Sequence, residues 1–433
     1  MPPGTWPLRS DRLRLFRNVL VHPTQEMRDP DGAFFRGGPE WPRFAMQILA
    51  RHCRGRIPRP IDAKPVPARP RWPYFDPQLL PQFWPQLGID PQLSPPDRET
   101  ALARLAETLA PLPEQLSDRI DAGIWCGPIH LHFGETIAAW GMRLAGSNRA
   151  DGALPLVFSL PPFRHTEPPA FFWDMLDHLR IDRRRVLLVR TPTRFDRLYV
   201  LRQAERLYGG GPHRRHLAMM DEITADRTIA RDVECVFVSR ARMPDGHFAG
   251  ESYLDEALAA AGAVAFHPET TDLHTQLRLY RRARVLIFSE GSALHALQLL
   301  GHLDCDLVVL VRRPGYRIAT ASLRPRTRSL RYIQPRDIVY GLSQSGHPML
   351  RAGITVLDEH ALVADLDAAG VRLGAVWDAK AYAERRDADI DCWLAARRTS
   401  ERHPKDRALV EQRLRRLELP LSPQPDGGRI AAG

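Results

Sequence analysis

The sequence lacks the cysteine pattern of a disulfide-stabilised protein or of a structural zinc site. Its five cysteines are far apart, odd in number and never in CxxC spacing: Cys53, Cys126, Cys235, Cys305 and Cys392. Disulfide frameworks and zinc sites are both built from regularly spaced cysteines. We therefore expect reduced thiols, most of them buried in the core.

Long apolar runs are also missing. No stretch approaches the roughly 18 apolar residues that a membrane-spanning helix requires. Residues 1–20 contain no apolar run of the kind found in secretory signals. We therefore expect a cytoplasmic protein, which could also bind peripherally to the inner membrane.

Lysine is scarce, although the chain carries an excess of positive charge. Lysine and arginine together number 61 against 51 acidic residues, so the net charge is +10, and arginine predominates. Such a charge suits nucleic acid, anionic lipid or acidic substrates. The arginines are dispersed and are not interleaved with aromatic residues as in RNA- or DNA-binding motifs. We therefore expect no specific nucleic-acid partner.

Length and composition predict two cores with appendages. A chain of 433 residues, 44% of them apolar, can bury two cores. Proline and tryptophan are frequent over residues 1–98, which predicts an extended arm packed on the body, or else a flexible tail. The expected domains are an N-terminal α/β domain over 99–212 and a C-terminal Rossmann-like domain over 213–345. A helical segment with a tail follows over 346–433, and the glycine-rich residues 209–215 are the expected linker.

The expected fold class is α/β. Predicted strands cover 154–160, 186–190, 197–200, 235–239, 264–266, 285–288 and 307–311, with small strands within 329–335 and 354–358. Helical patterns cover 170–179, 251–261, 272–283, 293–300, 361–370, 377–398 and 404–419. Strands that alternate with helices predict parallel sheets covered on both faces.

Residues 284–301 organise the second half of the chain. Four apolar residues form a strand that is buried on both faces, and the sequence Ser-Glu-Gly-Ser then leads directly into a helix with leucines at 294, 297 and 300. The first N–H groups of a helix have no partner within it and lie at the positive end of its dipole. This corner favours a phosphate. The alternative is an ordinary turn in which Ser292 caps the helix.

Polar residues follow three of the predicted strands. They are Arg240 and Arg242 after the first, His267 and Glu269 after the second, and Glu290, Gly291, Ser292 and His295 after the third. The carboxyl ends of parallel strands share one edge, where ligands of such sheets bind. One guanidinium group can bind two phosphate oxygens at once, and it stays charged at any working pH. These residues together therefore suit a nucleotide diphosphate. Taken singly, each residue also fits a structural role, such as a surface charge, a packed histidine or a helix cap.

Two further candidates stand in the first half of the chain. His132 precedes Glu135, and an amphipathic helix follows through Ile137, Trp140 and Leu144. An imidazole and a carboxylate at a helix start are typical of exposed catalytic groups. They are equally consistent with a carboxylate that favours the helix dipole beside a packed histidine.

No DxD sequence, the usual carboxylate pair for a metal-bound diphosphate, stands at the end of a predicted strand. The DxD triplets at 365–367 and 387–389 fall within helical patterns near the C-terminus. We therefore expect metal-independent chemistry with no cofactor beyond the nucleotide substrate.

The segment 236–311 resembles the C-terminal half of glycosyltransferase family 61. That family has an Arg after a strand, an Asn-Glu pair opening a helix, a Pro-Glu before a helix with Gln, and an hGsaL turn. The corresponding segments are FVSRARMPDGHFAGESYL, FHPETTDLHTQLRLYRRARVLI and SEGSALHAL. GPIHLHFGETIAAW is similar to the family's His-aromatic-x-Glu stretch. The motifs are specific in combination rather than singly, and the resemblance covers residues 123–315.

The resemblance implies two Rossmann-like domains facing a cleft, the GT-B-like arrangement, with the proline-rich arm and the C-terminal helices added. It implies an inverting transferase that uses a nucleotide sugar and a cell-surface glycan or lipid-linked acceptor. Arg240 and the amides of Gly291 and Ser292 would hold the diphosphate, with Glu269 or Glu251 near the ribose or sugar. Glu135, or else His132, would be the base that deprotonates the acceptor hydroxyl.

The chain departs from the family pattern in two places. Where the family has Arg-Arg-x-x-Asn-Glu, residues 246–251 read GHFAGE, so the second arginine and the asparagine are missing. Arg242 and His247 are the candidates to replace them. Glu290 stands where the family often has histidine. These departures leave open a family member that has lost activity. The alternative to a transferase is a catalytically inactive α/β scaffold, or a polyanion- or nucleic-acid-binding protein that uses the same basic face.

Overall fold

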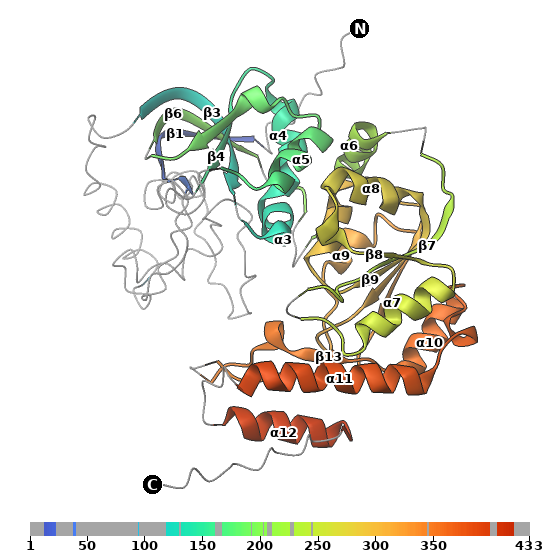
Figure 1. Cartoon of the computed structure of the whole chain (residues 1–433). Helices are drawn as coiled ribbons and strands as arrows, with labels where there is room; N and C mark the ends of the chain where they lie inside the picture. The colour runs from blue at the N-terminus through green and yellow to red at the C-terminus, as the bar shows by residue number, and fades with distance from the viewer. Residues whose placement is uncertain are drawn as a thin grey trace, which may run out of the picture. The chain divides into compact units, whose positions relative to one another are not determined.

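The computed structural model describes residues 13–22, 38–39, 94, 118–129, 131–160, 167–191, 193–201, 203–205, 210–225, 229–243, 246–343, 346–398 and 405–419. These residues belong to two compact units, whose elements are labelled in Figure 1. The first unit contains the described residues up to 226 together with 295–302 and 321–326. The second contains 227–294, 303–320 and the residues from 327 on. Most of the predicted arm lies outside the described residues.

The first unit contains a six-stranded sheet in the order β2-β1-β6-β3-β4-β5. Its strands are β1 Leu13–His22, β2 Gly38–Pro39, β3 Asp118–Pro128, β4 Leu156–Ser159, β5 Val186–Val189 and β6 Thr193–Leu201. β6, β3, β4 and β5 run parallel, and β1 runs antiparallel to both of its neighbours. The three strands predicted for this half are confirmed. β1 and β3 were not predicted.

The helices of the first unit are α3 Phe133–Glu135, α4 Leu144–Ala150, α5 Ala170–His178 and α6 Arg214–Thr224. The continuous helix predicted after Glu135 is wrong. α3 is followed by a π-helical stretch, Thr136–Trp140 (η3), then a 3-10 turn, Gly141–Arg143 (η4), before α4 begins. α6 begins at Arg214, within the residues expected to form the linker, and His213 caps it.

The second unit contains a five-stranded sheet in the order β11-β10-β9-β7-β8, with all strands parallel. Its strands are β7 Val233–Val238, β8 Val264–Phe266, β9 Ala283–Ser289, β10 Asp306–Leu310 and β11 Ser329–Ile333. The helices α7 Glu251–Ala260 and α8 Leu273–Arg282 lie on opposite sides of the sheet (Figure 1). Phe237 and Ile287 join the core under α7, whereas Phe288 packs against Tyr280 of α8. The predicted parallel sheet with two covered faces is confirmed.

The strand order places a switch point between β7 and β9. From β7 the chain first adds β8 on one side and then crosses to add β9, β10 and β11 on the other. Connections that leave in opposite directions open a crevice at the carboxyl ends of the two central strands, where doubly wound sheets bind their ligands. The loops after β7 and β9 start at this point.

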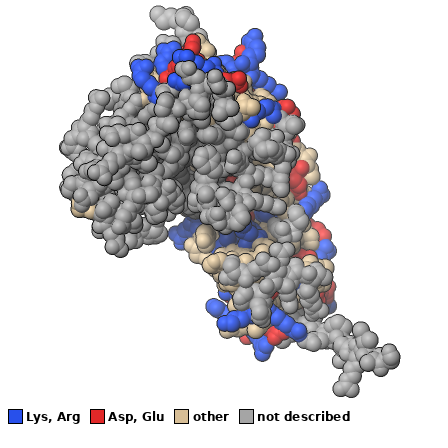
Figure 2. All heavy atoms as spheres, turned by 90° about the vertical axis from the view of Figure 1, so that its left-hand side faces the viewer, with Lys and Arg blue, Asp and Glu red and all other residues tan. Residues whose placement is uncertain are grey.

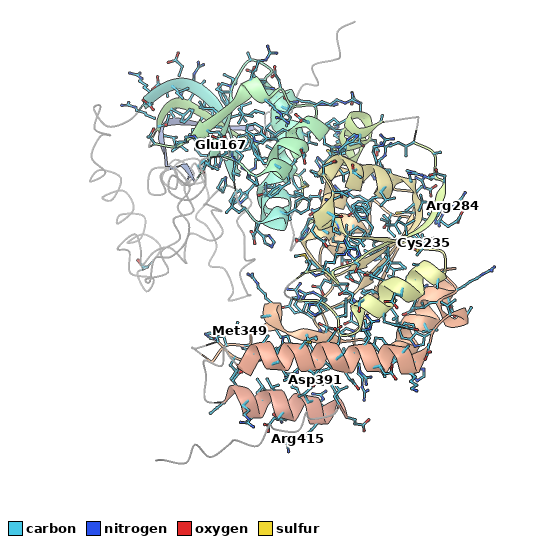
Figure 3. The ribbon with its side chains drawn as sticks, viewed as in Figure 1. Glu167, Cys235, Arg284, Met349, Asp391 and Arg415 are labelled. Atoms are coloured by element: carbon cyan, nitrogen blue, oxygen red, sulfur yellow. The ribbon has the colours of Figure 1, made fainter. Side chains whose placement is uncertain are left out.

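The C-terminal part adds a two-stranded antiparallel sheet and three α-helices. These elements are β12 Asp337–Val339, β13 Ile354–Val356, α10 Glu359–Ala368, α11 Ala379–Arg398 and α12 Asp406–Arg416. The short helix α9, Thr320–Leu323, belongs mostly to the first unit. Figure 3 labels Asp391 on α11 and Arg415 on α12. Ile390 of α11 and Leu414 of α12 share a buried cluster with both strands. The helices predicted over 361–370, 377–398 and 404–419 are confirmed, while β12 was not predicted.

The described thiols agree with the prediction of reduced cysteines. Cys126, Cys235 and Cys305 are free and buried, whereas Cys392 is free and exposed. Burial raises the pKa of each buried thiol to about 12, so none of the three is a nucleophile near neutral pH.

Charges of both signs mix on the surface that the structure describes. Figure 2 shows arginine and lysine interspersed with acidic side chains on one face. Within the described ranges, none of the helices combines the length and the apolar character needed to cross a bilayer.

Candidate anion-binding site

The corner predicted at 289–292 is present, but the helix after it is of another type. β9 ends at Ser289, and Ser292–Leu299 (η7) is a 3-10 helix instead of an α-helix. The leucines at 294, 297 and 300 are all buried. Leu294 and Leu297 lie one turn apart in this helix, because a 3-10 helix has three residues per turn, and Leu300 directly follows its last residue. Its first N–H groups have no partner within the helix.

Arg240 packs on this corner. A Cβ atom placed on Gly291 would lie 2.5 Å from Nη1 of Arg240 and 3.1 Å from its Cδ, so the guanidinium rests on the glycine backbone. Nε of Arg240 donates a hydrogen bond to the carbonyl of Gly246 at 3.0 Å. Burial lowers the pKa of Arg240, and nearby carboxylates partly oppose this. The loops after β7 and β9 therefore meet through these residues at the switch point of the sheet.

Glu251 holds this meeting point together. Its Oε1 accepts the backbone N–H of Arg240 at 2.8 Å and the hydroxyl of Ser289 at 2.5 Å. Its Oε2 accepts the N–H of Phe248 at 2.9 Å. The side chain is buried, and both of its oxygens are bonded within the protein. Glu251 therefore fixes the loop after β7 against the end of β9.

Two arginines that follow β10 join the corner through Glu290. Oε2 of the buried Glu290 accepts the backbone N–H of Arg312 at 2.8 Å. Its Oε1 accepts hydrogen bonds from Nε of Arg313, at 2.9 Å, and from Nη2 of Arg313. Nε of Arg312 donates to the Glu290 carbonyl at 2.9 Å. Because β10 lies next to β9, the loop after it brings both guanidinium groups to this end of the sheet.

Three guanidinium groups, those of Arg240, Arg312 and Arg313, lie close together at the corner. They face two buried carboxylates, those of Glu251 and Glu290, and the partly exposed Glu269 also acts on Arg240. Burial, reinforced by the positive charge of Arg240, lowers the pKa of Arg312 to about 10, and Glu290 only partly opposes this. An anion bound here would relieve the repulsion between the arginines.

The residues after β8 lie further from Gly291. β8 is an edge strand and β7 separates it from β9, so the two loops start about 10 Å apart, or two strand spacings. Nε2 of His267 lies 3.4 Å from Oδ2 of Asp255, and its Nδ1 lies 3.9 Å from Oε1 of Glu269. Asp272, and not Glu269, caps α8.

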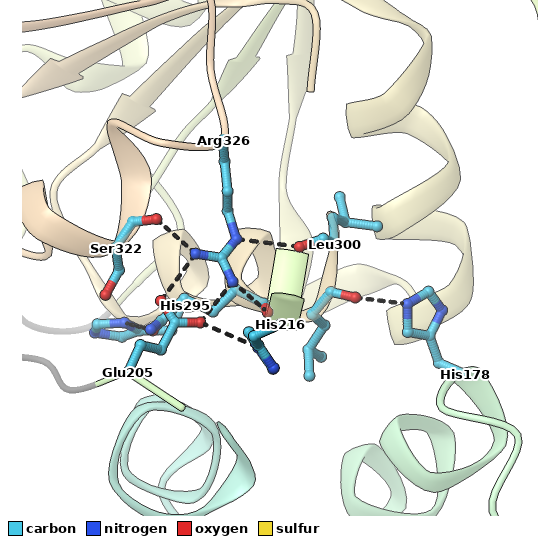
Figure 4. A network of polar contacts seen from close by, with 9 residues as sticks. His178, Glu205, His216, His295, Leu300, Ser322 and Arg326 are labelled. Atoms are coloured by element: carbon cyan, nitrogen blue, oxygen red, sulfur yellow. Dashed lines mark hydrogen bonds and ion pairs between the residues drawn. The ribbon is translucent and has the colours of Figure 1, made fainter. Parts of the chain in front are cut away.

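Arg242 and His295 differ in exposure. Arg242 is exposed in the loop after β7. His295 is buried, its Nδ1 lies 2.8 Å from Oε1 of Gln298, and it belongs to the residues of the first unit. Figure 4 draws it within a polar network of that unit. Ser292, at the start of η7, is half-buried.

The proposed bases belong to the first unit. His132 caps α3, because its Nδ1 accepts the backbone N–H of Glu135 at 3.2 Å. His132 is exposed and Glu135 is half-buried. The π-helical stretch begins immediately after Glu135, and such irregular turns are frequent at functional sites.

Sequence reasoning missed Arg312 and Arg313. The signal was present, because both directly follow the predicted strand 307–311. The carboxyl end of this fourth strand lies at the same edge of the parallel sheet as the strand end before Arg240.

Comparison with known proteins bears on the same segments. Residues 80–300 match the family model described as Glycosyltransferase 61, which spans just over half of the 433 residues. The matched range includes Glu135, Arg240 and the corner at Gly291. A search of curated proteins gives no match. The chain therefore belongs to glycosyltransferase family 61.

Proposed function

We propose that this glycosyltransferase is inverting and metal-independent, and that it moves a hexosyl or pentosyl group from a nucleoside diphosphate sugar. The acceptor would be a cell-surface polysaccharide or a lipid-linked glycan. The observation that carries the choice of donor is the packing of Arg240 on Gly291, beside the first N–H groups of η7. A guanidinium and free backbone amides at a switch point are well suited to hold a diphosphate.

In this proposal the acceptor hydroxyl attacks the anomeric carbon opposite the leaving group. The new C–O bond forms as the bond to the diphosphate oxygen breaks, and the electron pair of that bond leaves with the nucleoside diphosphate. Arg240 and the amides of the corner stabilise the departing charge. The hydroxyl proton passes to the carboxylate of Glu135, with His132 as the alternative.

The excess of arginine supports the metal-independent part of the proposal. Arg240, Arg312 and Arg313 supply positive charge at the place where a divalent ion would otherwise neutralise a diphosphate. Both DxD triplets lie in helices, as predicted, one in α10 and the other in α11. Oδ2 of Asp389, in the second triplet, accepts the N–H of Gly250 at 2.8 Å.

Domain limits and location are part of the same proposal. Residues 99–212 would form the acceptor domain and 213–345 the donor domain of a GT-B-like enzyme, with the arm 1–98 and the segment 346–433 added. The enzyme would be bacterial and cytoplasmic. Its net charge of +10 would favour peripheral contact with an anionic membrane.

Replacing Arg240 by alanine is expected to weaken binding of a nucleoside diphosphate sugar by about 10- to 100-fold, because it removes charge-assisted hydrogen bonds to phosphate. The affinity of Arg240→Lys should lie between those of the wild type and Arg240→Ala, since an ammonium keeps the charge but loses the planar fork of the guanidinium. A thermal-shift screen of nucleotide sugars identifies the ligand, because bound ligand raises the melting temperature. Titration calorimetry then measures the affinity.

Arg284→Ala is the matched control. Arg284 is an exposed arginine at the amino end of β9, on the opposite edge of the same sheet (Figure 3). We expect wild-type affinity from this variant. Binding to polyanions alone, weakening steeply with salt and equally in all variants, would instead support a polyanion-binding protein.

Gly291→Ala tests the contact itself. The added Cβ would lie 2.5 Å from Nη1 of Arg240, which is the flexible end of a side chain, so the guanidinium should move while the fold persists. We expect a melting temperature close to wild type and an affinity for the same donor reduced about tenfold, as for one lost hydrogen bond to a charged group. Unchanged affinity would show that the donor does not bind at this corner.

A further inference from the structure

The guanidinium of Arg312 is buried and only partly bonded. The residue is 7% exposed, and its Nε donates to the carbonyl of Glu290. Its Nη1 is buried with no hydrogen-bond partner among the described residues. A buried N–H group without an acceptor costs free energy, so proteins retain few of them unless a ligand or an ordered water completes the bond.

Nη1 of Arg312 lies against the loop that also holds Arg240. A Cβ atom on Gly246 would lie 2.0 Å from this Nη1, so the guanidinium fills the place of a side chain at that position. The backbone there has φ of 67°, a conformation that glycine adopts readily. The carbonyl of the same glycine accepts Nε of Arg240 at 3.0 Å. Two guanidinium groups therefore converge on one residue.

The carboxylate of Glu290 does not bond to this nitrogen. Oε1 of Glu290 accepts a hydrogen bond from the side chain of Arg313. Its Oε2 accepts hydrogen bonds from the backbone N–H groups of Arg312 and Arg313, at 2.8 and 3.3 Å. Glu290 thus holds the loop after β10 in place and leaves Nη1 of Arg312 unbonded. Nη1 of Arg312 is therefore a buried donor that the acceptors of the cluster leave unused.

We propose that Arg312 is the second phosphate ligand of this enzyme, and that it forms with Arg240 a clamp for the two phosphates of the donor. The clamp rests on the proposed function and deepens it, because it makes the site selective for diphosphates over monophosphates. One phosphate binds at the Gly291 corner with Arg240, and the other accepts a hydrogen bond from Nη1 of Arg312. In this arrangement the anion enters next to Arg240, which is only half-buried.

Titration calorimetry with inorganic pyrophosphate and inorganic phosphate, at one fixed salt concentration, tests the clamp on the whole chain. Arg312→Gln should weaken pyrophosphate binding about 10- to 100-fold, the usual effect of a lost hydrogen bond to a charged group. The loss for single phosphate should be several-fold smaller, because one phosphate can stay with Arg240. Arg312→Lys should fall between wild type and Arg312→Gln.

Arg386→Gln is the matched control for removing a partly buried arginine from the second unit. Arg386 pairs with Asp387 and Glu359 and has no part in the cluster. The Arg386→Gln variant should bind pyrophosphate with the affinity of the wild type. If Arg312→Gln does not fold, the comparison of Arg312→Lys with wild type decides, since the ammonium keeps the charge but not the fork.

The outcomes separate the clamp from the proposed function. If Arg240→Ala weakens binding while Arg312→Gln and Arg312→Lys bind pyrophosphate like wild type, Arg312 is not a ligand and only the clamp is overturned. Equal losses for phosphate and pyrophosphate would also overturn it. If wild type binds neither pyrophosphate nor any nucleoside diphosphate sugar, the proposed function fails and the clamp fails with it.

Discussion

Replacing Arg326 by methionine is expected to lower the free energy of unfolding of the first unit by about 3–5 kcal/mol. Arg326 and Glu205 are both 0% exposed and form an ion pair inside that unit. Methionine leaves the buried carboxylate without its arginine, with only the His216 imidazole nearby, whose Nε2 lies 3.8 Å from Oε1 of Glu205. A buried charge that has lost its partner is strongly destabilising. Native-state hydrogen exchange measures the loss, because it reports opening free energies separately for the amides of each unit.

The hydrogen bonds of Arg326 explain why the loss should be large. Its guanidinium donates to Glu205 at 2.8 and 2.5 Å. It also donates to the carbonyls of Leu300 at 3.1 Å, Ser322 at 2.6 Å and Gln298 at 3.2 Å, as Figure 4 shows in part. These five bonds use all five N–H donors of the guanidinium. One side chain thus joins three separate stretches of the chain.

Two further variants make this prediction specific. Arg328→Met removes an arginine two positions away that pairs with Asp306 while exposed, and it should barely change the exchange rates. Adding Glu205→Leu to Arg326→Met should recover part of the stability, because neither charge of the buried pair then remains without its partner. A single Arg326→Met variant as stable as Arg328→Met would contradict the expected effect.

Glu135→Gln is expected to lower the rate of sugar transfer by about 10²- to 10⁴-fold, the range for losing a general base. Donor affinity should stay within about twofold of wild type, because glutamine has the shape of glutamate and Glu135 is not among the groups proposed to bind the diphosphate. The amide cannot accept the proton of the acceptor hydroxyl. Glutamine has the shape of glutamate, so the backbone N–H of residue 135 can still donate to His132. Transfer assays with the donor found by thermal shift give the rate.

His132→Asn separates the two candidate bases. Asparagine is a preferred N-cap residue, so it should preserve the start of α3 while removing the imidazole. If Glu135 is the base, this variant should retain most of the activity. Near wild-type transfer by Glu135→Gln, together with an inactive His132→Asn, would assign the base to the histidine.

The elements of the second unit were predictable because its signals agree. β8 occupies the residues predicted for it, Val264–Phe266, and α8 begins at Leu273, one residue after the predicted start. The strands are short apolar runs, and the helices between them carry apolar residues at helical spacing. In a parallel sheet both faces of each strand are buried, so apolar runs are strong evidence of strands.

The first unit was harder to predict because composition misleads there. β1 lies within the proline-rich arm, although Leu13–His22 contains no proline, and Phe16, Val19 and Val21 are fully buried. β3 contains glycines, which weaken a strand pattern. One of them, Gly123, is needed because a Cβ atom there would lie 2.6 Å from Cγ2 of Val157 on the neighbouring strand.

The departure from the family motif has a structural explanation at one position. Gly250 stands where the family pattern has asparagine, and its φ is 78°. Glycine and asparagine are the residues that most readily adopt this left-handed conformation. The substitution therefore keeps the backbone that brings Glu251 to the start of α7. Arg312 lies beyond residue 300, where the match to the family ends.

The sequence by itself determined the order of strands and helices in the second unit, the corner after β9, the strand ends that carry polar residues, and the family. These depend on local periodicity and on motifs a few residues long. Only the tertiary structure decided which loops meet. β9 lies between β7 and β10, so Arg240, Gly291 and Arg312 come together while His267 stays a strand further away. Arg326 likewise pairs with Glu205 across 121 positions of sequence. Such contacts follow from strand order and packing of the whole unit, which no local pattern encodes.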